Sequence, residues 1–307
     1  MAIKLQLLKN ALDSSKNYLQ KKPVVMSFEV TNKCNLKCEM CYWWKHRIEK
    51  ELSVDEIVNL FKILRKKYKI FHCTYGGGEP TLRPDVLTKC TKIMPENWII
   101  TNGTIDMPKL NNKSTIGVSI DGTEKIHNKV RGKNIYNQIK ERYKDYTKYP
   151  VYTATTLVQS NKNEIEEIVK EWSKTSIKGM FFDFATPFKN SNNEFFISLN
   201  ERDKIIDRII KLKKEYGNFI TFPEKGYNYL RKEFITKRSK DCILKWFALC
   251  LDSQGKRKMP CGLGKDIICN KCGCITAAFV QYYFKPRIES PLIILNLINK
   301  RLFNKKN

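Results

Sequence analysis

The sequence predicts an α/β protein: a partial (β/α)6 TIM-like barrel, followed by a small C-terminal cysteine-rich auxiliary domain. Three observations support this prediction. From Val24 to about residue 220, short apolar runs alternate with helix-period segments, as in parallel strands joined by crossover helices. About six such units fit there, which is fewer than in a complete barrel. After Gly217 the chain becomes loop-rich and holds most of its 11 cysteines.

Each predicted element has its own local pattern. Ser53 and Glu56 form a capping box, and apolar residues then recur at helical spacing up to Tyr68. Further helices are predicted at 164–172 and at about 201–216, each with one apolar face. In a barrel of this kind, the chemistry is expected at the C-terminal ends of the strands. Buried strands are predicted at 24–30, 69–75, 97–100, 115–120, 151–158 and 180–184.

Composition limits the functional classes. With 307 residues and 42% hydrophobic residues, the chain can build a large core, so a disordered protein is excluded. The net charge of +26 suits nucleic acid, an anionic membrane or an acidic partner, but the dispersed lysines equally suit a solvated exterior, and no nucleic-acid motif is present. Neither a secretory signal nor a membrane-spanning apolar run is found. We therefore expect a cytoplasmic, reducing environment, where clustered cysteines bind metal or act in catalysis.

Three cysteines follow the first predicted strand. Cys34, Cys38 and Cys41 have C-x3-C-x2-C spacing, which strains disulfide geometry. Structural zinc takes four ligands, and the nearest histidine is His46. A [4Fe-4S] cluster also normally takes four thiolates, so three would leave one iron open to a substrate or cofactor. The spacing therefore favours an open, catalytic iron–sulfur site.

The stretch CNLKCEMC resembles the cluster-binding motif of the radical S-adenosylmethionine (SAM) superfamily. Similar motifs follow in the family's order: GGGEP at 76–80, TNGT at 101–104 and GVSIDGTEKIHNKVRG at 117–132. The resemblance covers about residues 24–184. It implies that Cys34, Cys38 and Cys41 bind a [4Fe-4S] cluster whose open iron holds SAM. Reductive cleavage of SAM would then yield a 5′-deoxyadenosyl radical, which abstracts hydrogen from a substrate.

The same motifs supply the predicted SAM contacts. The glycines of GGGEP carry no side chains, so their backbone can approach the methionine part of SAM closely. Glu79 can pair with the SAM ammonium, and Arg131 can offer its planar fork to the carboxylate. Ser119 and Asp121 lie two apart on one strand, so both can point toward ribose or methionine groups. The residues predicted to bind SAM, with Tyr42 near the adenine by family analogy, are Tyr42, Gly76, Gly77, Gly78, Glu79, Thr101, Asn102, Ser119, Asp121 and Arg131.

The cysteines after Gly217 resemble the opening of SPASM and twitch domains, which bind auxiliary [4Fe-4S] clusters. The shared form is a cysteine, an apolar hairpin with glycine at its turn (Gly255), and then Pro-Cys. There are fewer cysteines than in a full SPASM domain, so one twitch-like second [4Fe-4S] cluster is predicted. A structural zinc ribbon is the alternative. The predicted ligands are Cys242, Cys261, Cys269 and Cys272, with Cys250 and Cys274 as alternates, whereas Cys73 and Cys90 are predicted core thiols.

Four regions are expected along the chain. These are an N-terminal basic helix at 1–22, the radical SAM partial barrel at 23–220, the SPASM/twitch-like domain at 221–285 and a basic amphipathic tail at 286–307. The tail suits either a peripheral contact with an anionic membrane or packing on the barrel. From the short N-terminus, we expect no separate leader-binding domain.

The leading hypothesis is a radical SAM enzyme, of oxidoreductase or maturase type, that receives electrons from a donor such as flavodoxin or ferredoxin. Its substrate is not identified: a peptide or protein, or an anionic small-molecule, sugar or lipid precursor. The alternative is a non-enzymatic iron–sulfur or zinc-ribbon protein that binds nucleic acid through its lysines. No catalytic acid, base or radical relay is evident, and Asp183 and Tyr75 are the nearest candidates.

Overall fold

The computed structural model describes residues 2–41 and 50–284. Its sheet has seven parallel strands in the order β6-β5-β4-β3-β2-β1-β7. The first six follow the predicted positions and confirm the partial barrel. In chain order the strands are β1 (Val25–Thr31), β2 (His72–Gly77), β3 (Glu96–Thr101), β4 (Ser114–Ser119), β5 (Val151–Leu157), β6 (Met180–Phe184) and β7 (Ala248–Leu251).

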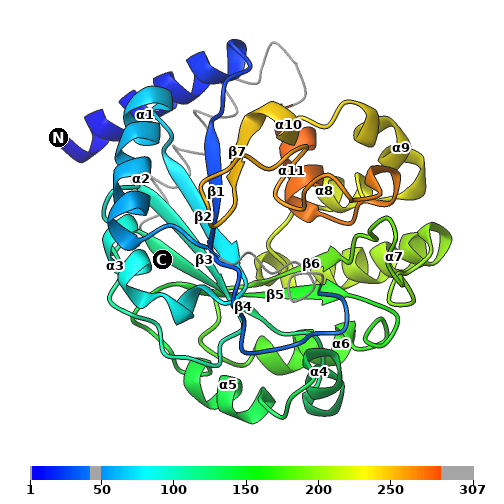
Figure 1. Ribbon diagram of the computed structural model, residues 1–307. Helices are drawn as coiled ribbons and strands as arrows, with labels where there is room; N and C mark the ends of the chain where they lie inside the picture. Colours follow the sequence, from blue (N-terminus) through cyan, green and yellow to red (C-terminus); the bar gives the residue numbers. More distant parts are fainter. Residues whose placement is uncertain (1, 42–49, 285–307) are drawn as a thin grey trace.

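Helices surround the sheet, and α8 to α11 gather beside β7 (Figure 1). The described helices are α1 (Ala2–Leu19), α2 (Val54–Tyr68), α3 (Pro84–Cys90), α4 (Glu124–Arg131), α5 (Tyr136–Tyr143), α6 (Ile165–Trp172), α7 (Leu199–Tyr216), α8 (Glu224–Asn228), α9 (Lys232–Lys240), α10 (Leu244–Phe247) and α11 (Ile275–Phe284). Short 3₁₀ turns lie at η2 (Pro80–Leu82), η3 (Gly217–Phe219) and η4 (Cys269–Lys271). The order of strands and crossover helices places the C-terminal strand ends at one rim.

Local sequence explains the helix that follows the first cysteines. The Ser53–Glu56 capping box is formed on both sides, and it satisfies backbone donors at the start of α2. On the inner face of α2, Phe61 is fully buried and meets Phe28 of β1 edge-to-face, with ring centroids 5.2 Å apart. This pair lies in the main core. The predicted apolar face of α2 therefore packs against β1.

β7 was not predicted from the sequence. It comes from the cysteine-rich segment and pairs with β1, with Phe28 opposite Leu251. A tight hairpin follows, closed by a bridge between Leu251 and Arg257, and Gly255 adopts a φ of +75° at its turn, as the apolar hairpin pattern indicated. Leu249 and Leu251 belong to the main core. The cysteine-rich segment therefore adds a strand to the barrel sheet. Other apolar residues of the segment, among them Ile243, Phe247 and Val280, form a separate buried cluster with Tyr18 and Val24.

Two predictions fall on residues outside the described ranges: the adenine contact of Tyr42, and the amphipathic tail at 286–307. The N-terminal helix is present as α1. Across 2–41 and 50–284, no helix combines the length and apolar character needed to cross a bilayer.

Candidate functional site

The three clustered cysteines lie directly after β1, at the C-terminal rim of the sheet. None of the three forms a disulfide with another described residue; Cys38 is buried, while Cys34 and Cys41 are half-buried. The backbone N–H of Cys41 donates to the carbonyl of Cys38 (3.1 Å), which forms a turn. Glu39 N–H donates to the Val130 carbonyl (2.8 Å), so this turn is tied to α4. The chain thus presents the three thiols on one short loop.

The glycine turn after β2 packs against the start of this loop. Gly78 N–H donates to the Thr31 carbonyl (2.7 Å), and Glu79 N–H donates to the Lys33 carbonyl (2.9 Å). A Cβ at Gly78 would lie 2.0 Å from the Lys33 carbonyl oxygen, so only glycine permits this approach. A Cβ at Gly76, in contrast, would meet no atom of residues 2–41 and 50–284 within 4 Å. Gly78 is needed for the cysteine loop, and Gly76 borders open space.

Glu79 is buried, with 1% of its surface exposed, and its carboxylate accepts hydrogen bonds from within the protein. Its Oε1 accepts hydrogen bonds from Thr81 Oγ1 (2.7 Å), Thr81 N (3.0 Å) and Thr101 Oγ1 (2.8 Å). Its Oε2 accepts one from Asn102 N (2.7 Å). The carboxylate thus fixes the end of β3 beside the glycine turn, and its contact with the SAM ammonium stays a prediction.

Asn102 links that strand end to the cysteine loop. Its Nδ2 donates to Asn35 Oδ1 (2.8 Å) and lies 4.0 Å from Cys34 Sγ. Its Oδ1 accepts from Thr104 N (2.9 Å). Burial raises the pKa of the Cys34 thiol, with backbone N–H of Leu36 acting in the opposite direction. Of the predicted residues, Asn102 thus lies beside a predicted cluster ligand.

Arg131 reaches the cysteine loop from the end of α4. Its Nη2 forms an ion pair with Asp121 (2.5 Å), and its Nη1 donates to Cys38 Sγ (3.7 Å). The guanidinium therefore places a positive charge beside the Cys38 sulfur. Asp121 is fully buried, also accepts from Thr156 N (2.8 Å) and holds Arg131 in place, while its direct contact with SAM stays a prediction. Ser119 is also buried, at the end of β4.

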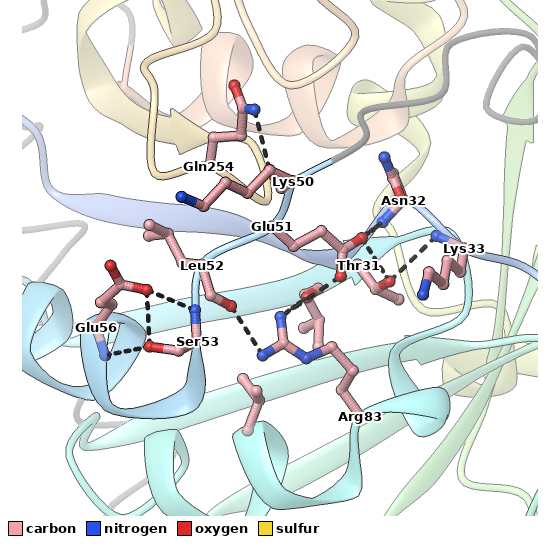
Figure 2. Close-up of polar contacts among 12 residues, drawn as sticks. Thr31, Asn32, Lys33, Lys50, Glu51, Leu52, Ser53, Glu56, Arg83 and Gln254 are labelled. Carbon is pink, nitrogen blue, oxygen red and sulfur yellow. Dashed lines mark hydrogen bonds and ion pairs between the residues drawn. The ribbon is translucent and has the colours of Figure 1, made fainter.

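Glu51 was not identified from the sequence, although it holds both sides of the cysteine loop. Its Oε1 accepts from Thr31 Oγ1 (2.8 Å) and Asn32 N (2.6 Å), as Figure 2 shows. Arg83 lies 3.6 Å from Oε2 of Glu51 and donates to the Leu52 carbonyl (2.9 Å). Residues on either side of the three cysteines are thereby held together. A single glutamate before a capping box has no distinguishing sequence pattern.

The cysteine-rich segment also contacts this rim. Lys258 forms an ion pair with Glu29 of β1, whose register partner on β2 is Gly76. Burial raises the pKa of Glu29 to about 7, although the Lys258 ammonium opposes the shift. Gln254 Nε2 donates to the Lys50 carbonyl (3.0 Å; Figure 2). A carboxyl that titrates near neutrality therefore stands one strand away from the glycine turn.

Four cysteines of the second group influence one another electrostatically. Burial is the main cause that raises the thiol pKa values of Cys242, Cys261 and Cys269, and the Cys272 thiol raises each further. Cys274, an alternate ligand, lies near Cys272 and Asp183, whereas Cys250 lies near Lys258 and Glu29. The predicted ligands share this neighbourhood with both alternates, because Cys250 also raises the pKa of Cys261, and Cys272 and Cys261 both raise that of Cys274. Within the described ranges, no three His, Cys, Asp or Glu side chains surround a single metal-ion position.

The remaining candidates are buried in the core. Tyr75 is fully buried and donates to Asn97 Oδ1 (3.0 Å), so it is a structural residue. Cys73 and Cys90 are fully buried, as predicted. Asp183 accepts from Ile275 N (2.6 Å), and burial raises its pKa to about 6.

The residues of the rim fit a SAM-bound [4Fe-4S] cluster. Three thiols share one loop, and a guanidinium lies beside one of them. Open space borders Gly76, where a ligand can reach the backbone. Three donors leave one iron free for a further ligand. The donor set therefore suits the cofactor that the motifs imply.

Comparison with known proteins agrees with this site. The family model of the Radical SAM superfamily matches residues 28–172. A cysteine-type anaerobic sulfatase-maturating enzyme of Clostridium novyi is 26% identical over 268 residues, 75% of this chain and 71% of that protein. A putative glycyl-radical enzyme activating enzyme of Methanocaldococcus jannaschii is 28% identical, over 60% of this chain and 74% of that protein. The structure of Streptococcus suis SuiB bound to the precursor peptide SuiA shares the fold, with a TM-score of 0.60 and 13% identity, over 89% of this chain and 69% of that one. Residues 28–172 therefore form a radical SAM domain, and the chain is an enzyme.

Proposed function

We propose that this enzyme is a maturase that modifies a peptide or protein by radical chemistry. A [4Fe-4S] cluster on Cys34, Cys38 and Cys41, with SAM bound, supplies a 5′-deoxyadenosyl radical that abstracts hydrogen from the substrate. The observation that carries the proposal is the joint placement of the thiol loop, the open backbone at Gly76 and the guanidinium of Arg131 at Cys38.

The chain's own residues bind and orient the cofactor. Arg131 is held by Asp121, so its positive charge stays beside the Cys38 sulfur, where the cluster would bind. Glu79 fixes the strand end that carries Asn102, and Asn102 in turn lies beside Cys34. Gly76 and Gly77 offer backbone groups to SAM, and Ser119 offers a hydroxyl from β4. Tyr42 remains the residue proposed to contact the adenine.

A second [4Fe-4S] cluster is proposed on Cys242, Cys261, Cys269 and Cys272. Support comes from their shared neighbourhood around Cys272. We also propose a low-potential donor such as flavodoxin or ferredoxin as the electron source, and a cytoplasmic location with a peripheral contact to anionic membrane. The barrel at 23–220 and the cysteine-rich segment at 221–285 would act as one unit, because β7 joins them.

A peptide or protein substrate is favoured by the similarity to the sulfatase-maturating enzyme, which extends through most of both chains. The fold shared with SuiB, solved with its precursor peptide, agrees with this choice. The net charge of +26 suits a substrate with acidic residues near the modified position.

The test is an anaerobic assay for 5′-deoxyadenosine with reconstituted enzyme, SAM and dithionite. Wild type should form it, and Cys38→Ala should not. Cys90→Ala, which removes a buried core thiol, is the matched control and should retain activity. Equal formation by Cys38→Ala and wild type would contradict the proposed ligand set. No formation by any form would contradict the proposed reaction.

A further inference from the structure

Two arginines converge on the turn that holds Cys272. Arg202 of α7 donates from Nη1 to the Cys272 carbonyl (2.9 Å) and from Nη2 to the Lys271 carbonyl (3.2 Å). Arg238 of α9 donates from Nη2 to the same Cys272 carbonyl (3.0 Å) and from Nη1 to the Cys274 carbonyl (3.2 Å). Two guanidinium groups from separate helices therefore bind one short run of backbone.

Both arginines are buried and lack a close carboxylate. Arg202 is 0% exposed and Arg238 is 4% exposed. Among residues 2–41 and 50–284, neither forms an ion pair with Asp or Glu. Asp183 acts on Arg238, and Asp203 on Arg202, only at longer range. Buried charges in proteins are normally paired, so we expect an anion close to these two arginines.

The residues around Arg202 pack against its guanidinium but do not neutralise its charge. Its guanidinium lies over the rings of Phe184 (4.7 Å) and Phe196 (5.5 Å). Its Nε is buried without a hydrogen-bond partner. Its hydrogen bonds instead go to the carbonyls of Lys271 and Cys272, on the turn that holds the predicted ligands. The anion that the site needs is thus a thiolate centre at the neighbouring cysteines.

The turn itself is fixed to the barrel. Gly273 N–H donates to Thr186 Oγ1 (2.9 Å), and the Gly273 carbonyl accepts from Phe184 N–H (3.1 Å). A Cβ at Gly273 would collide with the Phe184 carbonyl. The cysteines of this turn are therefore held at a set position relative to both arginines.

We propose that Arg202 and Arg238 are the counter-charges of an anionic iron–sulfur centre at these cysteines, and that they raise its reduction potential. This inference rests on the second cluster proposed above. A cluster with four thiolates carries net negative charge, and reduction adds another. Nearby cations favour the reduced form, so the potential rises with each of them. The arginines are positioning residues, because they act through the backbone and through charge and do not bind iron.

The test uses the full chain with Cys34→Ala, Cys38→Ala and Cys41→Ala, so that only the second site can hold a cluster. After anaerobic reconstitution, the midpoint potential is measured by redox titration with EPR detection. Arg238→Met in this background should shift the midpoint to more negative values. Arg238→Lys keeps the charge and should stay near the parent. Lys237→Met, the matched control, removes an exposed charge from the same helix and should also stay near the parent.

The possible outcomes distinguish failure of the proposed role of the arginines from failure of the proposed second cluster. Equal midpoints for Arg238→Met and Lys237→Met overturn the inference and leave the second cluster intact. An equally large shift in Arg238→Lys overturns it too, because charge would then not be the cause. If Arg238→Met binds no cluster, retention in Arg238→Lys supports the inference, and loss in both overturns it. No iron–sulfur signal in the triple-alanine parent overturns the second cluster and the inference together.

Discussion

The glycine turn offers a direct test of how the cysteine loop is positioned. In Gly78→Ala, the new Cβ would lie 2.0 Å from the Lys33 carbonyl oxygen, whereas real Cβ atoms essentially never approach within 3.0 Å. The Lys33 backbone must therefore move by about 1 Å, and Cys34 follows it directly in the chain. A displacement of about 1 Å in catalytic geometry costs on the order of 100-fold in rate. Gly76→Ala is the matched control, because its Cβ meets no atom of the described residues within 4 Å.

Iron content, SAM binding and 5′-deoxyadenosine formation are measured for both variants after anaerobic reconstitution. Gly78→Ala should lose iron or activity by about 100-fold. Gly76→Ala should fold and hold the cluster as the wild type does, and bind SAM more weakly because its methyl group enters the open space. Full activity in Gly78→Ala would refute the steric reasoning. Iron loss in Gly76→Ala equal to that in Gly78→Ala would refute the assignment of open space to the cofactor.

Three further variants test the network around the site. Glu51→Ala removes two hydrogen bonds at the base of the loop, so iron release to a chelator should accelerate by roughly 10-fold or more, unlike in the exposed control Glu56→Ala. Arg131→Met leaves Asp121 buried without its cation and should lower the free energy of unfolding by about 3–5 kcal/mol; an unchanged Tm would contradict this. The pKa of Glu29 is raised from 4.5 to about 7, so wild-type stability should fall as pH rises through that interval and then level off. Glu29→Gln removes this fall, and its stability relative to wild type should rise by up to about 3 kcal/mol between pH 4.5 and pH 8 in urea unfolding of metal-free protein; an equal difference at both pH values would count against it.

The sequence predicted those parts of the site that lie in contiguous motifs. The cysteine spacing, GGGEP and the strand before each of them are local patterns, and their positions in the structure follow from parallel strand order. Glu51, Lys258 and Arg202 are ordinary residue types that act across long separations in the chain: Glu51 is 20 residues from Thr31, and Lys258 is 229 from Glu29. Their roles depend on tertiary contacts, which no local pattern encodes.

The same limit explains why Glu79 and Asp121 were assigned direct contacts with SAM. Their motif positions are near the cofactor in the family, but a carboxylate at such a position can serve either ligand or backbone. In the structure, each is buried, and each holds a neighbour: Asn102 for Glu79, and Arg131 for Asp121. These contacts within the protein depend on tertiary packing and are not readable from sequence, and the contacts of Glu79 and Asp121 with SAM stay predictions.

β7 makes the cysteine-rich segment necessary for the barrel as well as for its own cysteines. Without it, β1 would become an edge strand, and the main core would lose Leu249 and Leu251. The N–H of Leu52 also donates to the Ser253 carbonyl (3.0 Å), close to the first cysteine loop. A chain ending at residue 220 is therefore expected to lack a cooperative thermal transition and to bind less iron at Cys34, Cys38 and Cys41. Circular dichroism melting and iron analysis check this. A fragment that melts cooperatively and keeps the first cluster would show that the two segments are independent, because β1 would then be stable without its outer neighbour.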